Sequence, residues 1–304
     1  MIGPRDNMDN MEDMDDMATQ RSILSGDVRL AVREYGEPTA PTVVAVHGYP
    51  DNQRMWVPVA ERLQRDFHVV TYDVRGAGDS EAPRGRSSYV SERLVDDLAA
   101  VLDATAPDGA VHLVGHDWGS LQLWDAVTTE QSDPRLRGRL ASYTSMSGPC
   151  LDHMAHFVRT APNDVRRRQA KQSWYVNFFQ VPVLPDLTWR LLHRAIGAQM
   201  ARREGLPRSA WGPELGRDGD HGLDLYRANI LPRLRSPRAG TTEVPVQVVV
   251  ARQDPFMSPE TIDALDLDRF LTTWRRLDVD SGHWLPRKDP DLVARLVREW
   301  ALSR

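Results

Sequence analysis

The sequence has 304 residues, of which 41% are hydrophobic and 27% charged, a composition typical of a globular domain with a large buried core. Its one cysteine, Cys150, excludes a disulfide framework and a cysteine-based zinc site, and no run of apolar residues is long enough to indicate a membrane span. One arginine and six acidic residues within positions 1–17 account for the whole net charge of −5, so the rest of the chain is neutral and gives no reason to expect a nucleic acid partner.

The N-terminal segment 1–20 is interpreted as a disordered acidic leader, because it is rich in aspartate and methionine and poor in other apolar residues. It lacks the basic and then apolar pattern of a secretion signal, so we expect a cytoplasmic protein. A helix that binds a partner, or a true start at Met17, are the open alternatives for this segment.

Beyond residue 20, apolar β-branched runs alternate with helical patterns. A short alternating strand at 28–33 is expected to pair with Ile23 and Leu24. Continuous apolar runs, typical of strands buried on both faces of a parallel sheet, follow at 42–48, 68–74, 110–117, 140–148, 244–254 and 273–282. Helical patterns lie at 91–105, 120–129, 259–267 and 290–303. This alternation predicts an α/β domain with a mostly parallel sheet flanked by helices.

The alternation stops between residues 151 and 240. Helical patterns occupy 155–179 and 187–200, and a passage rich in Gly, Pro and Asp follows at 205–222. We therefore predict a core made of 21–150 and 241–304, with 151–240 inserted as a helical cap. Such an insertion would cover the carboxyl ends of the strands, where open α/β sheets bind their ligands.

The strongest local motif is Gly-His-Asp-Trp-Gly at 115–119, between a buried strand and a helix. Its flanking glycines permit the sharp turn of a nucleophile elbow, which exposes the middle side chain, here Asp117. The alternative is that Asp117 only caps the following helix. Because a carboxylate is already ionised at neutral pH, it needs no base to attack a saturated carbon that bears a leaving group. The product of that attack is an ester of the protein.

An ester intermediate must be hydrolysed, which requires a base and a group that orients it. Asp254 ends the apolar strand 244–250, and His283 follows the last strand, so both lie at carboxyl ends of strands and in the expected chain order. Asp152 is the competing candidate for the acid role.

The segment His47-Gly48-Tyr49-Pro50 directly follows the strand at 42–46. In this arrangement an oxyanion hole combines a backbone N–H from that loop with the N–H of the residue after the nucleophile. We therefore expect the backbone N–H groups of Tyr49 and Trp118 to form it.

Together these segments resemble α/β-hydrolase-fold epoxide hydrolases over roughly 22–302, and are similar to the hydrolase half of actinobacterial proteins that fuse such a domain to a short-chain dehydrogenase. HGYP, GHDWGS, QDPFM and SGHW match the family's loop, nucleophile, acid and histidine segments. Since the sequence ends at Arg304, we expect it to correspond to the hydrolase half alone.

The resemblance also implies two cap tyrosines that hydrogen-bond the epoxide oxygen. Tyr175 lies in a matching Tyr-x3-Phe-Gln-x-Pro segment, and Tyr226 lies in a segment similar to that of the second tyrosine. A phenol remains protonated at neutral pH, so it can donate to the oxygen as charge develops during ring opening. Substrate contacts are expected from one set of residues: His47, Pro50, Trp118, Trp174 and Phe179.

The sequence thus predicts an epoxide hydrolase with Asp117 as nucleophile, Asp254 and His283 as the water-activating pair, and no cofactor or metal. The expected partners are an epoxide and water, and a homodimer is left open. The alternatives are a haloalkane dehalogenase, a natural-product tailoring enzyme or cyclase that opens an epoxide, and a non-catalytic binding protein. Trp118 fits a dehalogenase, but Tyr49 stands where that class carries asparagine, and an intact triad argues against a mere binder.

Overall fold

The computed structural model describes residues 18–304, so most of the expected acidic leader, residues 1–17, lies outside the described part of the chain. The expected end of that leader at residue 20 is corrected. The first strand begins at Thr19, which pairs with Glu34 across an antiparallel hairpin.

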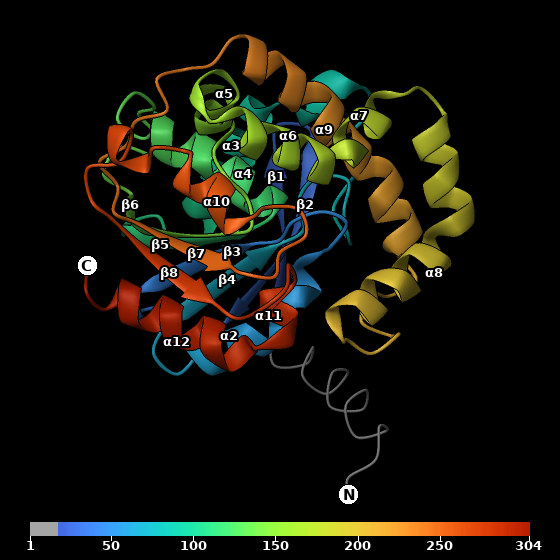
Figure 1. Cartoon of the computed structure of the whole chain (residues 1–304). Coiled ribbons are helices and arrows are strands. Elements are labelled where there is room, and N and C mark those ends of the chain that lie inside the picture. The colour runs from blue at the N-terminus through green and yellow to red at the C-terminus, as the bar shows by residue number, and fades with distance from the viewer. Residues whose placement is uncertain (1–17) are drawn as a thin grey trace, which may run out of the picture.

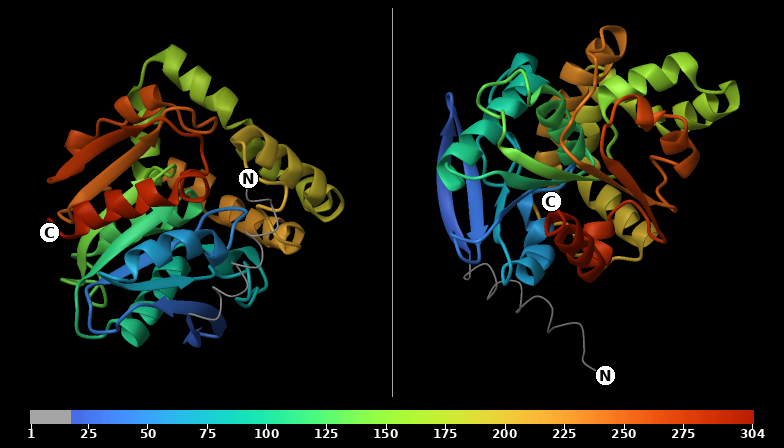
Figure 2. Two further views of the ribbon diagram at one scale, coloured as in Figure 1. Left: turned by 90° about the horizontal axis from the view of Figure 1, so that it is seen from below. Right: turned by 90° about the vertical axis from the view of Figure 1, so that its left-hand side faces the viewer.

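The described residues form one sheet in the order β1-β2-β4-β3-β5-β6-β7-β8. Strands β1 and β2 and strands β2 and β4 pair antiparallel, and every later pair is parallel, which confirms the predicted mostly parallel α/β fold. In Figure 2 the blue β1–β2 hairpin and the orange-red strands β7 and β8 lie at opposite edges of the twisted sheet. The strands are β1 (Thr19–Ser25), β2 (Val28–Tyr35), β3 (Thr42–Val46), β4 (His68–Tyr72), β5 (Val111–His116), β6 (Leu140–Met146), β7 (Val246–Ala251) and β8 (Trp274–Val279).

Helices cover both faces of the sheet, because its central strands are apolar on both sides. One core cluster joins α2 and α12 to the face that carries Val43, Val69 and Val114, and a second joins α3 and α4 to the other face. Figure 1 shows α2 and α12 below the sheet. The core helices are α2 (Val57–Leu63), α3 (Ser91–Thr105), α4 (Trp118–Thr129), α10 (Pro259–Asp263), α11 (Leu285–Lys288) and α12 (Pro290–Ala301).

Five helices, called the cap helices below, occupy most of 151–235, between β6 and β7, and α8 forms the right-hand edge of the molecule in Figure 1. The single helical pattern expected at 155–179 is three helices, because the chain breaks at Pro162 and Ser173. The helices are α5 (Leu151–Thr160), α6 (Asn163–Gln172), α7 (Trp174–Gln180), α8 (Leu184–Glu204) and α9 (Leu215–Arg235). Among residues 18–304, no helix combines the length and the apolar character that a membrane crossing requires.

Helix α9 begins at Leu215, inside the passage rich in Gly, Pro and Asp where the sequence indicated no helical pattern. Its glycines have a packing role. A Cβ at Gly219 would lie 2.3 Å from the Trp189 ring, and a Cβ at Gly222 would lie 2.4 Å from the Tyr49 ring. Close packing of two aromatic rings against this helix therefore outweighs the low helix propensity of glycine.

Candidate active site

Asp117 occupies a strained turn between β5 and α4. Its φ of 51° lies in the left-handed region, which non-glycine residues rarely adopt. The neighbouring glycines make the turn possible, because a Cβ at Gly119 would lie 2.1 Å from the Val46 carbonyl oxygen and one at Gly115 would lie 2.7 Å from the Ser120 Cα. This turn places the Asp117 carboxylate at the carboxyl end of the sheet, beneath the cap helices.

The Asp117 carboxylate accepts two backbone hydrogen bonds. The Tyr49 N–H donates to Oδ1 at 2.7 Å, and the Trp118 N–H also donates to this carboxylate. Burial raises the pKa of Asp117 to about 6, against the lowering effects of the His283 charge and of these two N–H groups. The two predicted oxyanion donors therefore converge on the carboxylate itself.

His283 lies between the two carboxylates. Its Nδ1 donates to Asp254 Oδ2 at 2.9 Å, and its Nε2 is 3.6 Å from Asp117 Oδ2. Burial by itself would lower the pKa of His283, but the charges of Asp254, Asp117 and Glu204 outweigh it and raise that pKa to about 9. For Asp254 the directions are reversed. Burial by itself would raise the pKa of Asp254, but the charge of His283 and its hydrogen bond lower that pKa.

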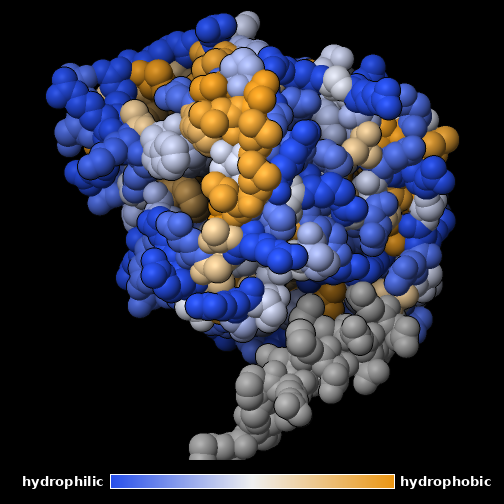
Figure 3. Space-filling view, turned by 90° about the vertical axis from the view of Figure 1, so that its right-hand side faces the viewer, coloured by the Kyte–Doolittle hydropathy of each residue, from blue (hydrophilic) through white to orange (hydrophobic). Residues whose placement is uncertain are grey.

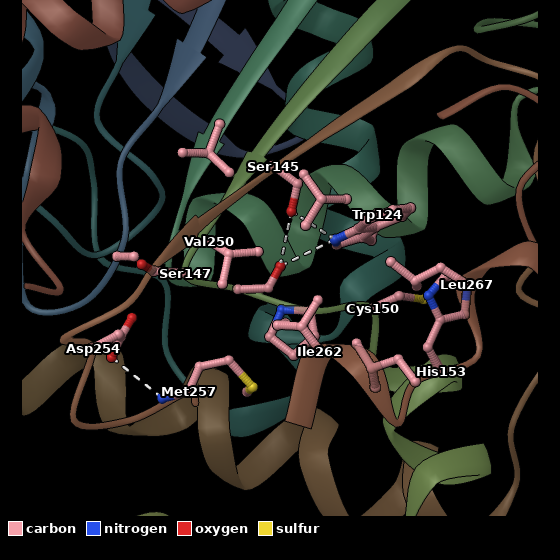
Figure 4. Close-up of a pocket in the computed structure, with 16 residues that line it drawn as sticks. Trp124, Ser145, Ser147, Cys150, His153, Val250, Asp254, Met257, Ile262 and Leu267 are labelled. Carbon is pink, nitrogen blue, oxygen red and sulfur yellow. Dashed lines mark hydrogen bonds between the residues drawn. The ribbon is translucent and has the colours of Figure 1, made fainter. Parts of the chain in front are cut away.

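Asp254 is fixed by its own loop. Its Oδ1 accepts the N–H groups of Phe256 at 2.8 Å and of Met257 at 3.2 Å, and Figure 4 shows the Met257 bond beside a small cavity of about 20 Å³. The competing candidate, Asp152, does not contact His283. It pairs with the Arg233 guanidinium at 3.0 Å and accepts the backbone N–H of Arg238. The geometry therefore makes Asp254 the acid partner of His283.

Two tyrosines reach the site from the cap. Tyr175 on α7 and Tyr226 on α9 have ring centroids 6.0 Å apart and nearly perpendicular planes. The ring centroids of Trp118 and Tyr226 are 4.9 Å apart, with an angle of 71° between their planes. Burial, together with the nearby charge of Asp117, raises the pKa of both phenols well above the usual value. Both side chains are therefore neutral donors at any physiological pH.

Two cavities, of about 500 and 370 Å³, meet at this group of residues. Asp117, Tyr175, Tyr226 and Phe256 line both of them. The first cavity extends under α5 and α6 and has Trp118 in its wall. The second extends toward α8 and is lined by the other site residues: Tyr49, Pro50, Trp174, Phe179, His283 and Trp284.

One expected substrate contact is wrong. His47 lines neither of these two cavities, and both of its ring nitrogens bind backbone atoms. Nδ1 donates to the Gly48 carbonyl at 2.9 Å, and Nε2 accepts the Val74 N–H at 2.9 Å. A single neutral tautomer satisfies both bonds, so His47 holds the loop that carries the Tyr49 N–H instead of contacting a ligand.

Two residues at the site were not identified from the sequence. The Phe256 ring centroid is 5.4 Å from that of Tyr175 and 4.8 Å from that of His283. Its position two residues after Asp254 could have identified it from the sequence. Glu204, at the end of α8, is buried, and its Oε2 has no hydrogen-bond partner. Nothing in the local sequence marks Glu204, because its role depends on where α8 ends in space.

Comparison with known proteins identifies the family. Residues 41–289 match the family model described as alpha/beta hydrolase fold. The chain is 34% identical over 288 residues to the probable oxidoreductase EphD of Mycobacterium tuberculosis, which covers 90% of this chain and 48% of that protein. It is also 34% identical over 170 residues to epoxide hydrolase A of the same organism, which covers 55% of this chain and 49% of that protein. The chain thus spans about half the length of these curated relatives.

Solved structures share the fold. The epoxide hydrolase VrEH1 from Vigna radiata superposes with a TM-score of 0.75 at 23% identity and covers 95% of this chain and 99% of its own. The Bacillus megaterium epoxide hydrolase in complex with an inhibitor gives 0.75 at 22% identity, with 94% and 100% covered. The matched family model and the shared fold lead to one conclusion: the chain belongs to the α/β-hydrolase-fold family.

Proposed function

We propose that this chain is an epoxide hydrolase that converts an epoxide to a vicinal diol through an ester of Asp117. The proposal rests on one arrangement. The Asp117 carboxylate and two neutral tyrosines line the same two cavities, and the His283–Asp254 pair lies beside Asp117. Names of similar proteins, such as epoxide hydrolase A, support the same substrate class.

Ring opening begins when an Asp117 oxygen attacks an epoxide carbon. The carbon–oxygen bond of the ring breaks, and Tyr175 or Tyr226 gives a proton to the released oxygen. An alkoxide is a poor leaving group, so donors placed on that oxygen lower the barrier as its charge develops. The product is a hydroxyalkyl ester of Asp117 and a tyrosinate.

The charge on His283 links the two half-reactions. A pKa of about 9 keeps its imidazole protonated at neutral pH while Asp117 is ionised. Esterification removes the Asp117 charge, so the pKa of His283 falls and the imidazolium can return a proton to the tyrosinate. His283 is then neutral and able to take a proton from water.

Hydrolysis regenerates the carboxylate. The activated water attacks the ester carbonyl, and the resulting oxyanion forms on an Asp117 oxygen. Since the Tyr49 and Trp118 N–H groups already donate to this carboxylate, they are placed to stabilise the oxyanion. The ester bond then breaks, and the diol oxygen takes its proton from His283. The Asp117 carboxylic acid left behind gives its remaining proton to His283, which restores the carboxylate and the imidazolium.

The two cavities support one class of epoxide. Their walls are mainly apolar, with Leu151, Phe157 and Ile230 in one and Phe178, Ile196 and Met200 in the other. Because both reach Asp117 and the tyrosines, an epoxide with apolar substituents on both sides of the ring fits the site better than a small terminal epoxide.

A dehalogenase receives less support. Its halide would need a second donor beside the Trp118 indole, and Tyr49 stands where that class carries asparagine. The test is a panel of apolar epoxides and chloroalkanes incubated with the purified chain, with diol and halide both measured. We expect diol from epoxides with substituents on both ring carbons, and no halide. Halide release without diol formation would overturn the proposal.

A further inference from the structure

A strip of exposed apolar side chains lies on the outer face of the cap. Of the ten large apolar side chains that residues 18–304 leave exposed, seven lie between positions 174 and 192. Figure 3, which faces α8, shows an orange band bordered by hydrophilic residues. We call the seven side chains the α8 strip: Trp174, Val181, Val183, Leu184, Leu187, Leu191 and Leu192.

The fold itself does not need the α8 strip. Helix α8 already buries its opposite face through Trp189, Gly197 and Ala201, while Leu191 remains 75% exposed and Leu192 53% exposed. Scattered exposed leucines are ordinary, but a contiguous group of this kind marks a surface that meets a partner.

The cap around the strip is basic, although the whole chain has a net charge of −5. Residues 163–204 contain eight Arg and Lys side chains and only three acidic ones. Of the acidic residues, Glu204 is buried and Asp186 is bound to Arg227 at 2.6 Å. The exposed basic side chains are Arg167, Arg168 and Lys171 in α6 and Arg190, Arg194, Arg202 and Arg203 in α8. Two of them pair with acidic residues outside 163–204, Arg190 with Asp220 at 2.7 Å and Arg168 with Glu260 at 3.7 Å.

The strip adjoins the route to the site. Trp174 belongs both to the strip and to the wall of the 370 Å³ cavity, and Thr188 in the same half of α8 also lines that cavity. The same cavity reaches Asp117 and His283. An apolar molecule released from a surface in contact with the strip would therefore reach the wall of this cavity directly.

We propose that the α8 strip rests on an anionic lipid surface, with its apolar side chains among the acyl chains and the surrounding arginines and lysines at the headgroups. Apolar side chains bordered by basic residues are the pattern of interfacial membrane binding. A second copy fits less well, because two-fold pairing of this face would bring the same positive charges together. Membrane binding through the α8 strip does not require hydrolase activity, so the two proposals can fail independently.

Vesicle sedimentation of the full chain tests this surface. We compare vesicles of phosphatidylcholine with vesicles that contain phosphatidylglycerol, at low and high salt. The chain should sediment with the anionic vesicles, and salt should weaken the binding. The double variant Leu187→Ser/Leu191→Ser should bind at least tenfold more weakly, since two exposed leucines no longer enter the lipid. Arg167→Gln/Lys171→Gln should lose roughly fivefold per charge.

The matched control is Leu24→Ser/Leu302→Ser, which removes leucines of similar exposure far from the cap and should bind like the parent chain. Circular dichroism checks that every variant is folded. Equal binding to neutral vesicles, no sedimentation with anionic vesicles, or full binding by the Leu187/Leu191 variant would each overturn the proposal. Sedimentation velocity provides a further check. If the parent chain were a dimer and the Leu187/Leu191 variant a monomer, the strip would be an interface with a second copy instead.

Discussion

Glu204, the last residue of cap helix α8, places its carboxylate against the backbone of Gly282, the residue before His283. A Cβ on Gly282 would lie 2.2 Å from Glu204 Oε2, so only glycine leaves room for the carboxylate there. The Glu204 charge is also among those that raise the pKa of His283. The end of the cap thus contributes to the electrostatics of a residue in the core.

We expect Glu204→Gln to shift the pH profile of ester hydrolysis toward lower pH. Negative charges raise the pKa of His283, so removing one lowers it and leaves more neutral imidazole at a given pH below that pKa. One pKa unit corresponds to about tenfold in the neutral fraction. The measurement is the decay of the protein adduct in single turnovers across pH.

The control for this variant is Asp164→Asn, which removes one charge from an exposed position of the cap and should leave the profile in place. An unshifted profile in Glu204→Gln would show that the Glu204 charge does not act on the pKa of His283. Besides Glu204, the titratable groups near His283 are Asp117, Asp254, His116, Tyr175 and Tyr226. Burial lowers the pKa of His116 to about 3, so that ring stays neutral.

His283→Gln should trap the covalent intermediate. A carboxylate needs no deprotonation before it attacks carbon, so the first step should proceed, whereas hydrolysis should fail without the base. Intact-protein and peptide mass spectrometry should find an increase equal to the whole epoxide on the peptide that contains Asp117. No adduct should form in Asp117→Asn, and an adduct elsewhere would contradict the assigned nucleophile.

A single turnover in heavy-oxygen water should label the Asp117 carboxylate and not the diol. Water attacks the ester carbonyl in the proposed route, so its oxygen enters the protein first. Mass analysis of the Asp117 peptide and of the diol reads both positions. Label in the diol from the first turnover would mean that water attacks the epoxide and that Asp117 acts only as a base.

Tyr175→Phe and Tyr226→Phe should each slow ring opening by about a hundred- to thousandfold, the usual cost of removing a donor from a developing oxyanion. The double change should nearly abolish adduct formation. Rapid quench of the alkylation step measures the effect, and Tyr89→Phe is the control, because this buried tyrosine lines neither large cavity. Unchanged alkylation in the double variant would remove both residues from the reaction.

Gly222→Ala should destabilise the chain, although alanine normally favours a helix over glycine by about 1 kcal/mol. The new Cβ would lie 2.4 Å from the Tyr49 ring, which must then move. Denaturant unfolding should report a loss of stability of about 1 to 3 kcal/mol. Gly109→Ala, where no atom lies within 4 Å of the new Cβ, is the control. A more stable Gly222→Ala would show that the ring is not packed against α9.

The sequence by itself determined the α/β fold, the elbow at Asp117 and the positions of Asp254 and His283 after their strands. These follow from short-range patterns: apolar periodicity, glycines at fixed spacing, and the rule that parallel strands bring their carboxyl ends together. Each signal is contained within a few neighbouring residues, so it can be identified without knowing the packing.

Only the tertiary structure decided which acid meets His283, since Asp152 and Asp254 both follow strands and Arg233, distant in sequence, engages Asp152. It also showed that α9 runs through a glycine-rich passage, that His47 binds backbone, and that Glu204 approaches Gly282. The physical reason is common to all of these: each depends on contacts between segments far apart in the chain, whose energies outweigh local propensity and leave no local pattern.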